Sequence, residues 1–215
     1  MIIAIDGPSA SGKSTLGRLL ARALNLLYID TGSMYRAVAL AVIEAHLDPR
    51  DTAAVTVLAN EIEIDLKGDP DSLSVLLDGR EVTEQIRTES VTEMASVVST
   101  IPGVRRAMVE RQRAMGKRGA VLNGRDIGTV VFPDADRKFF LDAAPEERAE
   151  RRFIEDQLKS TSSATLSETL ADLNERDRRD STRADSPLKI ADDAIVIDST
   201  GKSIEEVFAE MMKRI

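Results

Sequence analysis

The sequence contains no cysteine, no tryptophan and a single histidine, and aromatic residues make up 3% of its 215 positions. Without cysteine there is no disulfide, no thiolate nucleophile and no cysteine-ligated zinc. So few aromatic side chains offer little surface on which nucleic-acid bases could stack. Apolar runs stay far below the roughly 20 residues of a membrane span, and we expect no signal peptide. We therefore expect a protein of the reducing cytoplasm that binds neither membranes nor nucleic acid.

Positive charge is also in the minority, because the formal net charge is −8. A net negative charge disfavours anionic polymers and surfaces as partners. However, 21 of the 29 basic residues are arginine, which binds phosphate as a bidentate fork. The excess indicates small anionic ligands in a pocket, although a genomic composition bias would produce it too. The length suits one α/β domain with at most a small insertion, and we expect a monomer.

Residues 7–14 read GPSASGKS and match G-x-x-x-x-G-K-[ST] completely. An apolar run at 1–5 precedes the motif and an expected helix at 13–24 follows it, which is the context that a phosphate-binding loop requires. Its N–H groups converge on a phosphate at a helix N-terminus. Lys13 would meet the outer phosphates and Ser14 would offer its hydroxyl to Mg²⁺. The expected cofactor-binding residues of the loop are Gly7, Pro8, Ser9, Ala10, Ser11, Gly12, Lys13, Ser14 and Thr15.

The remaining pattern is α/β with one interruption. Residues 61–87 show alternating apolar positions around turn clusters, which predicts an antiparallel hairpin with a third short strand near 81–82. The expected strands are 1–6, 26–29, 119–122, 138–141 and 194–197. The expected helices are 13–24, 33–45, 52–60, 88–100, 102–115, 145–159, 166–179 and 203–214. This order predicts a doubly wound parallel sheet with a small inserted antiparallel unit.

Two groups of arginines recur at helical spacing. Arg148, Arg151 and Arg152 would share one helix face, and Arg176, Arg179 and Arg183 repeat that geometry if the helix continues as far as residue 183. The polar segment 160–165 joins them and is expected to be a mobile loop. We interpret the two faces as a lid that closes over phosphates. A solvated surface paired with nearby glutamates is the alternative.

Polar residues also follow two expected strands. Gly124-Arg125-Asp126-Ile127-Gly128 comes after the strand at 119–122, and ligands of open α/β sheets bind beyond the carboxyl ends of strands. Asp30-Thr31-Gly32 holds the corresponding place after the strand at 26–29. Ordinary turn chemistry explains both segments as well, and for 30–32 taken alone we favour it.

Four segments, in chain order, resemble one family. They are residues 7–14, Asp30-Thr31-Gly32-Ser33-Met34-Tyr35-Arg36, residues 124–129 (GRDIGT) and residues 176–183 (RDRRDSTR). Together they resemble bacterial cytidylate kinase, a family of P-loop nucleoside monophosphate kinases, over nearly the whole chain. The resemblance implies a core at 1–60 and 88–215, a monophosphate-binding subdomain at 61–87 and a helical lid at about 148–183. It also implies ATP and Mg²⁺, with the metal at Ser14.

The family resemblance further implies a role for each matching residue. The residues implied to hold the acceptor phosphate are Arg36, Arg125 and Arg183. Those implied to read cytosine are Ser96, Arg105 and Asp126. Those implied to reach the sugar are Arg176 and Asp180, with Thr31 nearby. Those of the lid over ATP are Arg148, Arg151 and Arg152. The implied catalytic residues are Lys13, Arg125, Arg152 and Arg183. One position departs from the family pattern: Asn123 stands where an acidic residue is usual.

The expected reaction converts ATP and CMP or dCMP into ADP and CDP or dCDP by direct in-line transfer. A kinase for another monophosphate, UMP or AMP, is the main alternative. A GTPase-like switch protein is a different class: residues 198–201 fit D-x-x-G but lie near the C-terminus, and no N-K-x-D occurs. A non-catalytic nucleotide-binding module would not need the second set of arginines.

Overall fold

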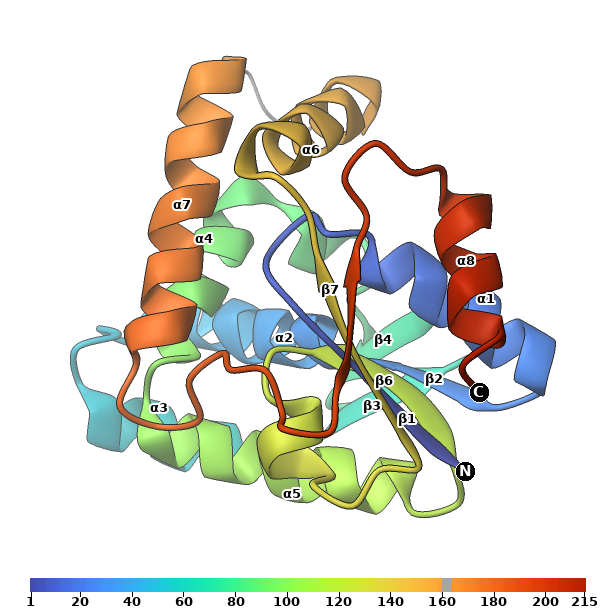
Figure 1. Ribbon diagram of the computed structural model, residues 1–215. Helices are drawn as coiled ribbons and strands as arrows, with labels where there is room; N and C mark the ends of the chain where they lie inside the picture. The colour runs from blue at the N-terminus through green and yellow to red at the C-terminus, as the bar shows by residue number, and fades with distance from the viewer. Residues whose placement is uncertain (160–163) are drawn as a thin grey trace.

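A computed structural model describes residues 1–159 and 164–215. Five parallel strands form the central sheet in the order β2-β6-β1-β7-β8 (Figure 1). Because the strands are parallel, their carboxyl ends meet at one edge, where Asp6 pairs in register with Gly124 and Asp30 with Asn123. The strands are β1 (Ile2–Asp6), β2 (Leu27–Asp30), β6 (Ala120–Gly124), β7 (Arg137–Asp142) and β8 (Ile195–Asp198).

Helices cover both faces of this sheet. Successive side chains of β1 point to opposite sides, so Ile3 and Ile5 join one apolar cluster while Ala4 joins the other. Strands buried on both faces read as continuous apolar runs, as β1 and β6 do. The helices of the Ile3 side are α1 (Lys13–Leu24) and α8 (Ile204–Met212). Those of the Ala4 side are α2 (Thr31–Glu44), α3 (Thr52–Glu61), α4 (Glu89–Val98) and α5 (Pro102–Gly116).

The segment 61–87 forms the expected antiparallel unit. Its strands are β3 (Ile64–Lys67), β4 (Ser74–Leu77) and β5 (Arg80–Glu81), and a 3₁₀ turn, η1 (Gln85–Arg87), follows. Asp78 and Gly79 both have positive φ, which gives the tight turn between β4 and β5. Val75 and Leu77 belong to the same apolar cluster as α2 and α4. The small sheet therefore shares a core with the main body.

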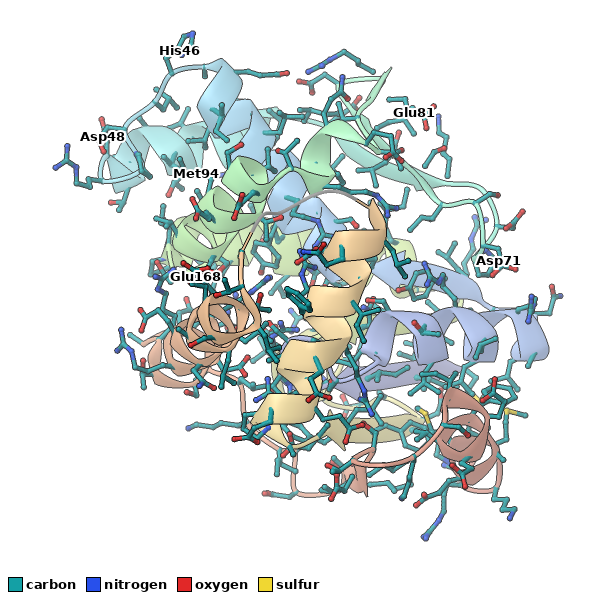
Figure 2. All side chains as sticks on the ribbon, turned by 90° about the horizontal axis from the view of Figure 1, so that it is seen from above. His46, Asp48, Asp71, Glu81, Met94 and Glu168 are labelled. Carbon is teal, nitrogen blue, oxygen red and sulfur yellow. The ribbon has the colours of Figure 1, made fainter. Side chains whose placement is uncertain are left out.

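Two further helices, α6 (Pro145–Lys159) and α7 (Leu166–Thr182), pack against each other at the carboxyl-end edge of the central sheet (Figure 1). Seen from above, α6 lies over the middle of the molecule and α7 carries Glu168 beside it (Figure 2). Thr165 caps α7 through a reciprocal pair of hydrogen bonds with Glu168. Of the predicted mobile loop, residues 160–163 lie outside the described residues. No described helix is both long enough and apolar enough to cross a bilayer.

Three local expectations are wrong. The turn at 30–32 is absent, because α2 begins at Thr31 directly after β2. Helix α7 continues past Arg179 to Thr182, where the hydroxyls of Ser181 and Thr182 bond to backbone carbonyls of the preceding turn. A wide helical turn, η2 (Ile127–Val131), follows β6 where no helix was expected.

Candidate active site

The loop between β1 and α1 has the backbone of a phosphate cradle. Gly7, Ala10 and Gly12 all have positive φ, and backbone of this kind is typical of loops whose N–H groups surround an anion. A Cβ on Gly7 would lie 2.0 Å from the carbonyl oxygen of Leu141, so no larger residue fits there. The backbone of strand β7 therefore packs directly against Gly7 and limits how far the loop can move from the sheet edge.

Lys13 folds back into this loop. Its ammonium donates to the carbonyl oxygen of Pro8 and to Oγ of Ser11, 3.2 Å away. Burial, with the positive charge of Arg125 nearby, lowers the pKa of Lys13 well below its ordinary value. The ammonium thus lies in the cradle, where an anionic phosphate would restore its normal basicity.

Ser14 and Asn123 offer oxygen atoms beside the cradle. The Asn123 amide, at the end of β6, donates to Oγ of the exposed Ser14 at 3.0 Å. Oδ1 of Asn123 is buried and has no hydrogen-bond partner within residues 1–159 and 164–215. A hydroxyl with a neighbouring free amide oxygen fits Mg²⁺, which takes oxygen ligands and keeps several waters.

Asp6 fixes the segment that follows β6. Its two carboxylate oxygens accept from the backbone N–H groups of Ile127 and Gly128, both at 2.8 Å. Burial raises the pKa of Asp6 to about 6, with a smaller contribution from the charge of Asp126. The last residue of β1 therefore sets the position of η2 and of the preceding Asp126.

Asp126 lies between two buried arginines. Nη2 of Arg105 donates to Asp126 at 2.5 Å, and Nη2 of Arg183 lies 3.8 Å from its other oxygen. Arg105 is 1% exposed and stacks over the ring of Tyr35 at 5.4 Å. Ser96, also buried, accepts from Arg179 of α7. Polar side chains from four segments of the chain, around residues 96, 105, 126 and 179–183, thus lie at this edge of the sheet.

Arg125 connects this cluster to the phosphate loop. Its Nε donates to Asp180 at 2.8 Å, while Nη2 donates to the hydroxyl of Ser9 at 2.7 Å. Asp180 also accepts from Arg183 at 3.2 Å. The guanidinium group of Arg125 therefore contacts both the phosphate loop and the residues of the expected acceptor-phosphate site.

Arg36 and Arg176 complete the basic surroundings. Arg36 donates to Asp30 and Ser33 at the start of α2. Although burial acts to raise it, the pKa of Asp30 lies below its ordinary value because of the charge of Arg36 and the hydrogen bond that the Ser33 hydroxyl donates to its carboxylate at 2.7 Å. Burial and the charge of Arg125 lower the pKa of Arg176 to about 10. Thr31 donates to the backbone of Asn123 at 2.7 Å, which ties α2 to the sheet edge.

The three arginines of α6 contact three different places. Arg148 donates to the carbonyl oxygen of Ser9 in the phosphate loop at 3.1 Å. Arg151 donates to the backbone and side chain of Ser199, in the segment between β8 and α8. Arg152 pairs with Asp156 on its own helix at 2.8 Å. Of these three arginines, Arg148 is the one that bonds to the phosphate loop in this conformation.

Three unsatisfied N–H groups lie among the residues of the expected acceptor site. Nε of Arg36, Nε of Arg105 and Nη2 of Arg183 are buried and have no hydrogen-bond partner in the described part of the chain. Buried donors are normally paired, and a free one costs about 1–3 kcal/mol. An anionic ligand with acceptor oxygens would satisfy them. A phosphate cradle joined to a second arginine site at the carboxyl end of a parallel sheet defines a P-loop kinase.

Comparisons with known proteins identify the family. Residues 3–215 match the family described as cytidylate kinase, and the chain belongs to that family. The cytidylate kinase of Geobacter sp. (strain M21) is 49% identical over 215 residues, which are 100% of this chain and 91% of that protein. The cytidylate kinase of Limosilactobacillus reuteri (strain DSM 20016) is 44% identical over 214 residues, 99% of this chain and 94% of that protein.

Solved structures agree on the fold. An uncharacterized protein from Eubacterium ventriosum has a TM-score of 0.56 at 12% identity, covering 100% of this chain and 98% of that one. Shikimate kinase from Bacteroides thetaiotaomicron has a TM-score of 0.51 at 13% identity, covering 100% and 97%. The predicted fold class and family resemblance are both confirmed.

Two site residues were missing from the sequence interpretation. Asp6 directly precedes the phosphate loop, and its place at a strand's carboxyl end was the available signal. Asp177 lies within the arginine-rich run of α7 and accepts from the backbone N–H of Ser9 at 3.1 Å. Nothing in its own segment points to this contact, because Ser9 lies 168 positions earlier in the chain.

Proposed function

We propose that this chain transfers the γ-phosphoryl group of ATP to CMP or dCMP, giving ADP and CDP or dCDP. The observation that carries the proposal is the contact of Arg125 with both Ser9 and Asp180. A residue shared by a phosphate loop and a second basic pocket is what direct transfer between two bound phosphates needs. The family's name supports cytidine monophosphate as the acceptor.

The transfer needs no covalent intermediate. An oxygen of the acceptor phosphate attacks the γ-phosphorus in line, and the bond to the β–γ bridging oxygen breaks as ADP leaves. Lys13, Arg125 and Arg183 supply positive charge where it develops on the transferring group, and Arg152 would join them when both nucleotides are bound. Catalysis is then positioning and charge stabilisation.

The remaining site residues have proposed binding roles. Arg148 and Arg151 lie on the ATP side. Arg36 and Arg183 hold the acceptor phosphate, while Arg176, Asp180 and Thr31 lie toward the sugar. Ser14 would hold Mg²⁺ with Asn123 beside it, and the bound metal would neutralise charge on the phosphate oxygens. The subdomain at 61–87 stays a proposed part of the monophosphate site.

Base choice follows from the buried acceptors. Asp126 and the hydroxyl of Ser96 can accept from the N4 amino group of cytosine, whereas uracil presents an oxygen at that position. Uracil would leave a buried carboxylate facing an oxygen, and sites of this kind discriminate by large factors.

A coupled ADP-release assay across CMP, dCMP, UMP, AMP and GMP tests the proposal. We expect CMP and dCMP to exceed UMP by at least about 100-fold in kcat/KM. Asp126→Asn should narrow the ratio of CMP to UMP, because a neutral amide can also donate to the uracil oxygen. Equal efficiency on CMP and UMP in the wild type would favour a kinase for another monophosphate. Binding without ADP release would favour a nucleotide-binding module.

A further inference from the structure

Ser9, at the crest of the phosphate loop, is held from three directions. Arg125 donates to its hydroxyl at 2.7 Å, and Arg148 of α6 donates to its carbonyl oxygen at 3.1 Å. Asp177 of α7 accepts from its backbone N–H at 3.1 Å. All three polar groups of one loop residue are therefore occupied by different elements.

Ser9, Asp177 and Arg148 form a closed ring of hydrogen bonds. The second carboxylate oxygen of Asp177 accepts from the same Nη1 of Arg148 that reaches Ser9. The carboxylate is 17% exposed and Arg148 is 7% exposed, so the pair is shielded from solvent. Arg148 also balances the negative charge of Asp177, which lies near Lys13 and would otherwise repel a donor phosphate. The carboxylate can thus stay in place when the cradle is filled.

Asp177 lies on the helix that carries the acceptor residues. Arg176 directly precedes it, and Asp180 lies about one turn further along α7 and binds Arg125. A ligand that fixes these residues would fix α7. Because Asp177 connects α7 to the Ser9 backbone, it would then fix the crest of the phosphate loop.

We propose that Asp177 is a positioning residue that couples occupancy of the acceptor site to affinity at the phosphate loop, with Ser9 as the joint. The inference rests on the proposed function, since it needs two nucleotide sites in one chain. A loop already ordered through α7 loses less conformational freedom when the donor binds, so its affinity rises. By reciprocity, the donor raises the affinity for the acceptor by the same factor.

Calorimetric titration of a non-hydrolysable ATP analogue, without and with saturating CMP, tests this coupling. We expect CMP to raise the analogue's affinity at least about fivefold in the wild type. Asp177→Asn should bring the ratio to within about twofold of one, since the amide keeps the shape but loses the charge-assisted bonds. Asp172→Asn, an exposed carboxylate on the same helix, should keep the wild-type ratio.

If Asp177 had a merely structural role, its substitution would lower the melting temperature and weaken the binding of both nucleotides. The ratio of the analogue's affinity with CMP to its affinity without CMP would then stay unchanged. If Asp177→Asn does not fold, Asp177→Ser carries the test, because the shorter side chain does not reach the backbone N–H of Ser9 and should lower the ratio as well. A wild-type ratio near one, or an unchanged ratio in the Asp177 variant that folds, overturns the inference. These results leave the proposed function intact, whereas absence of ADP release with CMP would contradict that function itself.

Discussion

Lys13 is a buried cation whose neighbours in this conformation are the loop's own oxygens. In the proposed reaction it meets the transferring phosphate and not the acceptor nucleotide. We expect Lys13→Ala to lower turnover by about 100-fold or more, while the Kd for CMP changes by less than about threefold. Steady-state kinetics and CMP titration measure the two quantities.

Folding of the Lys13→Ala variant serves as its own control. Burial lowers the pKa of Lys13 well below its ordinary value, so removing this side chain relieves a desolvation cost and the melting temperature should not fall. Near-normal turnover in the folded variant would show that this loop is not the phosphate cradle.

Asp6 makes the stability of the protein depend on pH. Its pKa is about 6 in the native state against an ordinary 3.8, so the native state binds more protons between these values. Stability from this group is complete below about pH 4 and is lost as pH rises through 6. The loss amounts to roughly 3 kcal/mol, at 1.36 kcal/mol for each pKa unit.

Asp6→Asn tests this linkage, because the amide does not titrate. Urea unfolding from pH 4 to pH 7 should show the wild type losing roughly 3 kcal/mol relative to the variant. Asp172→Asn should run parallel to the wild type over the same range. A constant difference between wild type and Asp6→Asn would contradict the shift.

At the scale of elements, the phosphate loop depends on its first glycine. A Cβ on Gly7 would meet the Leu141 carbonyl at 2.0 Å, whereas one on Gly79 would meet nothing within 4 Å, although both residues have positive φ. We expect Gly7→Ala to destabilise the protein by more than about 3 kcal/mol. Gly79→Ala should cost only the left-handed strain of about 1–2 kcal/mol. Chemical denaturation gives both values, and equal losses would mean that β7 does not constrain the loop.

Elements set by local chemistry could be predicted from the sequence. Helix α1 spans the expected Lys13–Leu24, and α5 begins at Pro102 as expected, because a proline suits the first helical position. The turn η2 could not be predicted, since its first N–H groups are satisfied by Asp6, more than 120 positions earlier in the chain. Thr31 was assigned to a turn because its polar neighbours suit turns, but its hydroxyl bonds to the distant Asn123 backbone.

In the candidate site, too, residues recognised from local sequence differ from residues whose roles depend on distant contacts. The motif at residues 7–14 could be recognised from its own spacing together with the apolar run and the helical pattern that flank it. The roles of Arg105 and Arg183 came from resemblance alone, because nothing local distinguishes a buried arginine from a solvated one. Their shared contact with Asp126 depends on three separate segments meeting at the sheet edge. Asp177 was missed for the same reason, since its partner Ser9 lies 168 positions away.

At the scale of the whole molecule, positive charge gathers between the sheet edge and helices α6 and α7. Burial, and after it the charge of Arg125, lower the pKa of Arg176 to about 10. Burial, and after it the charge of Arg105, lower the pKa of Arg183. Free nucleotides would supply the missing negative charge. We therefore expect ATP and CMP together to tighten α6 and α7 against the core by a shift in population.

Hydrogen exchange measures that tightening. Backbone amides of α6 around residues 148–156 and of α7 around 166–179 should exchange more slowly with both nucleotides, or with a bisubstrate analogue, than without ligand. Arg152→Ala should reduce this protection and lower turnover, because within residues 1–159 and 164–215 the Arg152 side chain bonds to Asp156 of its own helix, and a bound phosphate would offer it a stronger partner. Its effect on the free energy of unfolding should stay within about 0.5 kcal/mol, since a half-exposed i,i+4 pair contributes little to folding.

Strand β1, buried on both faces, is the internal control of the exchange experiment, because its amides should exchange equally slowly with and without ligand. Equal protection of α6 and α7 in the free protein and in the protein with both nucleotides bound would contradict this prediction. The two helices would then not move when ligands bind, and their movement would not limit turnover.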